Sequence, residues 1–130
     1  MDGAELKRRG TGGRTALTVT ALTGLLAVAL GAFGAHALEV FLEDAGRTGT
    51  WETAVLYHLV HAGILLLLCL VRPWRPRTWG LFFAGVTVFS GSLYILCLTG
   101  IGWLGAVTPV GGLLLILGWL SLAFSRLPPE

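Results

Sequence analysis

The sequence predicts an all-α integral membrane protein, a four-helix bundle with both termini in the cytoplasm (N-in/C-in). The first observation is composition: 55% of the 130 residues are hydrophobic, 12% are charged and the mean hydropathy is +0.79. A soluble domain of this composition would be coated in apolar surface. The second is four apolar segments, each near the roughly 20 residues that a helix needs to span the hydrocarbon core. The third is charge that alternates in sign between the connecting segments.

The predicted helices cover about residues 16–38, 54–71, 79–98 and 109–124, within a transmembrane domain over residues 16–126. Residues 1–15 are polar and Gly-rich, which predicts a cytoplasmic tail. Thr50 is expected to cap the second helix. Thr108 is expected to cap the fourth, with Pro109 in its first turn, where a missing N–H costs nothing.

The charges of the connecting segments predict the orientation. Basic residues precede the first helix, fill the turn between the second and third, and follow the fourth: Lys7, Arg8, Arg9, Arg14, Arg72, Arg75, Arg77 and Arg126. The loop between the first two helices carries instead Glu39, Glu43, Asp44 and Glu52 against Arg47. The positive-inside rule then places both termini in the cytoplasm, and the protein in the inner (cytoplasmic) membrane. Trp51, Trp74, Trp79 and Trp103 fall at predicted helix ends, where headgroup-level rings are common.

The N-terminus also permits a second interpretation. Basic residues, an apolar run and Ala35-His36-Ala37 resemble a signal peptide with a small-x-small cleavage site. Against this interpretation, the apolar run is longer than a signal core of roughly 7 to 15 residues. Cleavage would also leave three spans.

Small residues predict two packing seams, because close backbone approach replaces hydrophobic drive between helices in lipid. In the first helix they are Thr23, Ala27, Gly31 and Ala35; in the third they are Gly80, Ala84, Thr87, Gly91 and Tyr94. Cys69 and Cys97 are expected near opposite membrane surfaces, too far apart to form a disulfide.

Three histidines interrupt the apolar segments. His36, His58 and His61, together with Tyr57, Ser90 and Tyr94, are expected in the outer half of the bundle as a polar cluster. Ionisable groups inside a bilayer are costly and tend to face the bundle interior. The cluster has three interpretations: hydrogen bonds that hold the helices together, a haem, copper or zinc site built on the three histidines, or proton and substrate handling.

Other classes of function find little support in the sequence. The spans contain no acidic residue of the kind that ion-coupled transporters use. There is no nucleotide-binding loop, no Ser-His-Asp set and no basic stripe for nucleic acid. The lipid bilayer is the expected partner, with a membrane protein or a second copy as a further one.

Several strings together resemble a known family. They are Gly31-Ala-Phe-Gly-Ala-His36-Ala-Leu38, Trp51-Glu-Thr-Ala54, Tyr57-His58 with His61, Phe89-Ser-Gly-Ser-Leu-Tyr94, Leu98-Thr-Gly100, Leu104-Gly-Ala-Val-Thr-Pro109, Gly111-Gly112 and Gly118-Trp119. Over about residues 20–124 the chain resembles the membrane proteins of domain of unknown function 423, to which the eukaryotic transmembrane protein 256 is also similar. The resemblance implies an intact four-span protein without established activity or catalytic residues.

These observations lead to three expectations of function. The first is a non-catalytic membrane protein that supports a membrane complex or the membrane itself. The second is a small haem- or metal-binding protein that uses the outer-side histidines. The third is a small channel or transporter.

Overall fold

The computed structural model describes the backbone of residues 3–125 and the side chains of residues 12–125. Its helices are α1 (Gly3–Ala35), α2 (Glu39–Asp44), α3 (Thr48–Leu70), α4 (Pro76–Thr99) and α5 (Leu104–Ala123). All except α2 are long and apolar enough to cross a membrane, α1 over Gly12–Ala35. The four predicted spans are therefore confirmed. Arg126, one of the basic residues that predict the orientation, lies outside the described residues.

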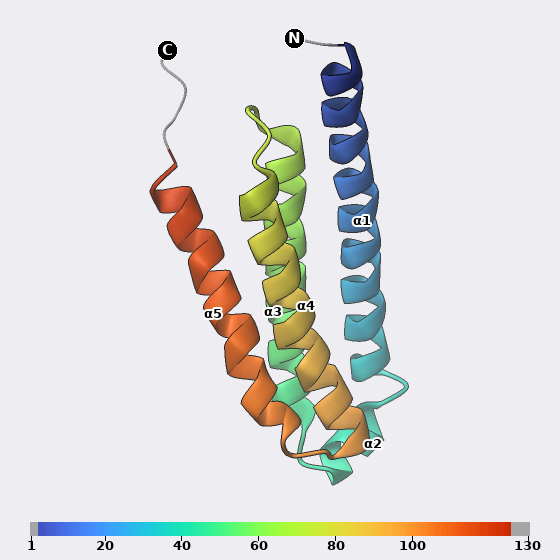
Figure 1. Cartoon of the computed structure of the whole chain (residues 1–130). Helices are drawn as coiled ribbons and strands as arrows, with labels where there is room; N and C mark the ends of the chain where they lie inside the picture. The colour runs from blue at the N-terminus through green and yellow to red at the C-terminus, as the bar shows by residue number, and fades with distance from the viewer. Residues whose placement is uncertain (1–2, 126–130) are drawn as a thin grey trace.

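The long helices run antiparallel along the chain, so the N-terminus, the α3–α4 turn and the end of α5 share one end of the bundle (Figure 1). The opposite end holds α2 and the α4–α5 turn. Packing follows the order α1, α3, α4, α5, with α1 against α3, α3 against α4 and α4 against α5. Both termini thus lie on the same side, which the N-in/C-in topology requires. The side of the membrane itself stays a prediction.

The helix boundaries differ from those that hydropathy predicts. The first helix begins at Gly3, because a helix extends its own hydrogen-bond ladder out of the membrane at little cost once it is nucleated. It ends at Ala35, and the next residues form a turn in which the Leu38 N–H donates to the Phe33 carbonyl at 2.8 Å. The short α2 was not predicted, since only Leu42 of its six residues is buried.

Neither predicted cap forms. Arg47 occupies the cap position of α3 but makes no capping hydrogen bond to that helix through its side chain, and Thr50 already lies inside the helix. The fifth helix begins at Leu104, so Thr108 also lies within it, 2.7 Å by its hydroxyl from that of Ser92. Pro109 removes one backbone hydrogen bond in the second turn. The start of this helix that Thr108 and Pro109 predicted is one turn too late, because hydropathy does not distinguish the first helical turn from the loop before it.

Buried side chains form two clusters. One, near α2, contains Leu42, Trp51, Ala54, Tyr94 and Cys97. The other, nearer the α3–α4 turn, contains Leu65, Leu68, Phe82, Val86 and Leu115. Trp51 lies in the first turn of α3, at a helix end as predicted, but it is only 2% exposed and so faces the bundle interior. Its indole N–H donates to the Leu30 carbonyl of α1 at 3.0 Å.

The tightest packing is between α4 and α5, where small residues of one helix face large residues of the other. A Cβ at Gly111 would collide with the backbone of Phe89, one at Gly118 with the ring of Phe82, and one at Gly85 with Leu115. Hydroxyl pairs, each 2.7 Å apart, close the two ends of this seam: Ser92 with Thr108, and Thr78 with Ser121. The α4 residues of this seam are spaced alternately four and three apart, as in coiled coils: Thr78, Phe82, Gly85, Phe89 and Ser92.

Candidate functional site

A groove of about 370 Å³ runs between α1 and α4. Its walls are mainly apolar and include Leu22, Leu26 and Leu30 of α1 and Phe83 and Val86 of α4. The groove exists because α1 packs on α3 rather than on α4. It is the best candidate for a binding site, since polar side chains lie at its base.

Three residues of the predicted polar cluster meet in this groove: His58, Ser90 and Tyr94. The Nδ1 atom of His58 lies 3.1 Å from the hydroxyl oxygen of Tyr94, and His58 also interacts with the backbone of Thr23. The buried Ser90 hydroxyl donates to the Ala54 carbonyl at 2.8 Å. His58 therefore connects α3 to both neighbouring helices, as interhelical hydrogen bonds do in membrane proteins.

His61 and Tyr57 lie away from the groove, toward α4 and α5. The Nδ1 atom of His61 lies 2.8 Å from the Tyr57 carbonyl and must donate to it, because a carbonyl only accepts. The Nε2 atom is buried and has no hydrogen-bond partner among the described residues. Around it stand the rings of Tyr57, Phe82 and Trp119, with centroids 5.7 to 6.4 Å from that of the imidazole. Tyr57 and His61 thus contact each other through the Tyr57 carbonyl and through their stacked rings.

His36 is exposed in the turn after α1, on a different element from the other two histidines. The structure does not bring the three histidines together as a ligand set. Within residues 12–125, no group of three His, Cys, Asp or Glu side chains is placed to hold a metal ion. Both cysteines are free, with the Sγ atom of Cys69 3.6 Å from the Thr20 hydroxyl and Cys97 buried beside Arg47.

The two predicted packing seams fare differently. In α1, Ala27 is fully buried and a Cβ on Gly31 would come within 3.2 Å of Val55, whereas Ala35 is exposed. In α4, Tyr94 of the predicted seam is buried and packs against Trp51 of α3, but the small residues of the seam have no helix of the described chain packed closely on them. No atom lies within 4 Å of a Cβ built on Gly80 or Gly91, and Ala84 is exposed.

The α4 helix packs on α5 through its other face, which the spacing of small residues did not identify. Large residues such as Phe82 and Phe89 mark the true seam, because the glycines that receive them lie on α5. Gly91 and Thr87 instead line the groove with α1.

Sequence reasoning also missed the role of Arg47, which was read as one loop charge among acids. Its guanidinium donates to the Cys97 carbonyl at 3.0 Å, in the last turn of α4. Gly100 ends that helix with a φ of 72°, and a Cβ there would meet the guanidinium at 2.8 Å. A basic side chain at this position satisfies free carbonyls and complements the helix dipole. The sequence did offer a signal for this helix end, because Gly100 follows an apolar run and glycine is common just after a helix.

The groove offers binding rather than evident catalysis. Its polar groups are hydrogen-bonded to one another or to backbone, and the acidic side chains that the structure describes lie on α2 and at the start of α3. Such a surface suits an apolar guest that also approaches the Tyr94 hydroxyl.

Comparison with known proteins gives a consistent picture. The model of the family described as "Protein of unknown function (DUF423)" matches residues 30–112. A UPF0382 membrane protein of Staphylococcus epidermidis is 45% identical over 112 residues, covering 82% of this chain and 90% of its own. The UPF0382 membrane protein YwdK of Bacillus subtilis is 44% identical over 109 residues, covering 78% and 87%.

The similarity extends to a eukaryote. A UPF0382 membrane protein of Schizosaccharomyces pombe is 36% identical over 115 residues, covering 83% of this chain and 98% of its own. No solved structure matches. With four membrane-spanning helices and these relatives, the chain is an integral membrane protein that belongs to the DUF423 family of unknown function.

Proposed function

We propose that this protein is a non-catalytic membrane protein that holds a transmembrane helix of a partner membrane protein in the groove between α1 and α4. The observation that carries the proposal is the open seam of α4. Ala84, Thr87 and Gly91 share the spacing of a helix-packing surface, yet no helix of the described chain covers them. Small residues let a second backbone approach closely, which is how helices gain contact energy in lipid.

The base of the groove supports the same function. A hydroxyl has one donor and two acceptor sites, so the single bond between Tyr94 and His58 leaves the hydroxyl of Tyr94 with capacity for another group. A polar side chain on the incoming helix would use that capacity and fix its register, since polar contacts are specific in an apolar medium. Thr87 donates its hydroxyl proton to the Phe83 carbonyl at 2.7 Å, so it brings no free donor into the groove.

For its location we propose the cytoplasmic membrane, with both termini inside. The four acidic side chains that the structure describes, Glu39, Glu43, Asp44 and Glu52, lie on α2 and in the first turns of α3. The arginines of the α3–α4 turn lie at the opposite end of the bundle (Figure 1). The positive-inside rule supports this orientation.

Site-specific photocrosslinking tests the proposed function. A photoreactive residue in place of Thr87, in cells that express the full chain, is expected to give a discrete adduct with another membrane protein. Gly91→Leu, which fills the groove, should abolish the adduct. Gly63→Leu is the matched control, because Gly63 is also a helical glycine with open space around its Cβ but belongs to α3 and does not line the groove.

Each outcome of this experiment bears on the proposal. An adduct that is lost in Gly91→Leu and kept in Gly63→Leu supports the proposal. The reciprocal experiment, with the photoreactive residue in the transmembrane helix of the partner, should then give the same adduct. An adduct only with a second copy would replace the partner by a homo-oligomer. Lipid adducts alone, or an adduct indifferent to Gly91→Leu, would exclude helix docking in this groove.

A further inference from the structure

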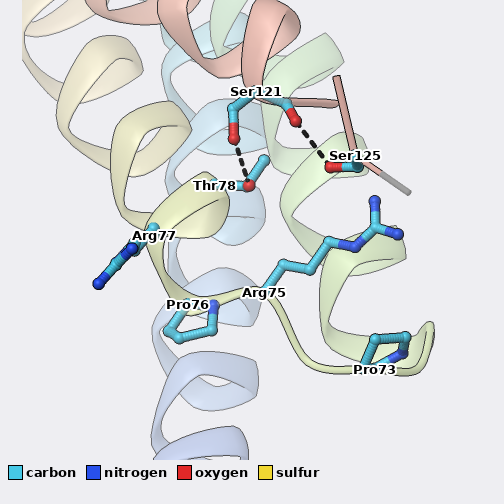
Figure 2. Close-up of a pocket in the computed structure, with 7 residues that line it drawn as sticks. All are labelled: Pro73, Arg75, Pro76, Arg77, Thr78, Ser121 and Ser125. Atoms are coloured by element: carbon cyan, nitrogen blue, oxygen red, sulfur yellow. Dashed lines mark hydrogen bonds between the residues drawn. The ribbon is translucent and has the colours of Figure 1, made fainter. Parts of the chain in front are cut away.

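A second cavity lies between α4 and α5, at the end of their seam where Thr78 meets Ser121. It has a volume of about 390 Å³ and is open to the surroundings, between the α3–α4 turn and the last turn of α5. Figure 2 shows Arg75 extending along it toward Ser125, with the Thr78 and Ser121 hydroxyls above, while Arg77 points away on the far side of the turn. The cavity is separate from the groove between α1 and α4, with which it shares no lining residue.

Among the residues that the structure describes, the charged side chains around the cavity are all basic. Arg72 and Arg75 belong to the turn and Arg77 to the first turn of α4, and Arg75 and Arg77 line the cavity. The acidic side chains that the structure describes are all at the opposite end of the bundle. An anion is therefore the ligand that this end attracts, and arginine matches the geometry of phosphate oxygens in particular.

The hydroxyl groups add neutral donors to this charge. The Thr78 and Ser121 oxygens lie 2.7 Å apart, so one of the two hydroxyls donates to the other. The proton of the accepting hydroxyl stays available for a third group. Ser125 closes the rim by donating to the Ser121 carbonyl at 2.6 Å. The cavity thus combines a guanidinium with hydroxyls fixed on two packed helices, and Thr78 is only 4% exposed.

The surroundings place this cavity at headgroup level. Trp74 and Trp79, with ring centroids 6.3 Å apart, belong to the same turn and the first turn of α4, as interfacial aromatic residues do. The adjoining ends of α3 and α5 expose apolar side chains, with Leu70 65% and Phe124 83% exposed. An anion that brings its own acyl chains would contact both the polar cavity and these apolar ends.

We infer that the cavity between the α3–α4 turn and the end of α5 binds the phosphate of an anionic phospholipid. Arg75 supplies the charged donor, and the Thr78–Ser121 pair supplies a hydroxyl proton. The lipid would bridge α4 and α5 at their open end. Basic pockets between transmembrane helices on the cytoplasmic side recognise lipid headgroups in this manner.

Native mass spectrometry tests this inference on the full-length protein in mild detergent, titrated with phosphatidylglycerol or with phosphatidylcholine. The expected result is one tightly retained phosphatidylglycerol, with at least about tenfold preference over phosphatidylcholine, since loss of a charged hydrogen bond changes affinity by about that factor or more. Arg75→Gln should remove the preference. Arg72→Gln is the matched control: it removes the same charge from the same turn, but Arg72 does not line the cavity and donates to the Cys69 carbonyl instead.

Three results would overturn the inference: equal retention of the two lipids, equal loss in Arg75→Gln and Arg72→Gln, or displacement of the lipid by excess inorganic phosphate. The second would indicate diffuse attraction to the basic turn, and the third a site for free phosphate. If circular dichroism shows that Arg75→Gln is misfolded, Arg75→Lys and Ser121→Ala decide. The lysine variant should keep most of the preference, and the alanine variant should weaken phosphatidylglycerol binding while leaving phosphatidylcholine unchanged.

Discussion

His58 and His61 occupy neighbouring positions on α3, yet their surroundings differ in kind. His58 has polar partners on two other helices, whereas His61 is bonded to the carbonyl of its own preceding turn and directs Nε2 into an aromatic cluster. The first arrangement holds helices together. The second leaves a buried acceptor without a partner, which costs free energy.

Replacing each histidine by phenylalanine should therefore have opposite effects. His58→Phe strips Tyr94 of its partner and should lower the free energy of unfolding by about 1 kcal/mol, the scale of interhelical hydrogen bonds in membranes. His61→Phe removes the unpaired nitrogen and should leave stability unchanged or higher. Unfolding by SDS titration from mild-detergent micelles measures both variants.

Tyr94→Phe, alone and combined with His58→Phe, completes a double-mutant cycle for that pair. A coupling near zero would show that the hydrogen bond contributes nothing. Greater destabilisation by His61→Phe than by His58→Phe would contradict this interpretation and indicate that Nε2 serves an unseen ligand.

Gly34 and Trp51 show why the strings that identified the family could not be interpreted individually. A Cβ on Gly34 would run into the indole of Trp51, which hydrogen-bonds to α1. Neither residue reveals this relation from its own position, because 16 residues, including the unpredicted α2, lie between them. A tryptophan near a helix end is ordinarily taken for an interfacial anchor.

At the scale of elements, α4 presents one face to α5 and another to the groove. The α5 face is defined by glycines on the partner helix. A Cβ on Gly111 would collide with the backbone of Phe89. A Cβ on the adjacent Gly112 would lie 3.8 Å from the ring of Phe89, which is an ordinary contact distance. These neighbours differ in whether a methyl group can be accommodated.

Gly111→Ala should force α4 and α5 apart and lower the free energy of unfolding by about 1 to 3 kcal/mol, as overpacking does. Gly112→Ala should be neutral or raise stability by up to about 1 kcal/mol through helix propensity. SDS titration again provides the measurement, and Gly112→Ala serves as the matched control. Similar losses in the two variants would mean that the helices do not meet at Gly111.

The ends of the helices were harder to predict than their existence. A span is recognised from the sum of many apolar residues, and this sum is robust to single positions. The last turn depends on single contacts, such as the guanidinium of Arg47 on the end of α4. Thr50 and Thr108 had the right residue type for caps, but both helices begin earlier.

For the whole molecule, the shared end of both termini turns the charge pattern into a test of orientation. In a chain with Cys69→Ala and Cys97→Ala, a cysteine replacing Asp44 in α2 should react with a membrane-impermeant maleimide on intact cells. A cysteine replacing Arg72 should react only after permeabilisation. Both positions are exposed in the structure, so access depends on the side of the membrane.

Labelling of both variants after detergent treatment provides the control for intrinsic reactivity. The reverse pattern on intact cells would invert the topology and move the proposed lipid site to the outer leaflet. The prediction rests on the excess of arginine at one end of the bundle and of carboxylates at the other.

The sequence by itself determined that the protein is an all-helical membrane protein with four spans, and it predicted which loops share a side. These properties depend on hydropathy and charge summed along the chain, and no partner residue is needed to read them. Tertiary structure decided which faces meet. It buried Trp51, separated His36, His58 and His61, paired α4 with α5 through Gly111 and left the Gly91 face open. A transmembrane helix is apolar on every side, so its rotation is fixed by the steric fit of small and large residues far apart in sequence.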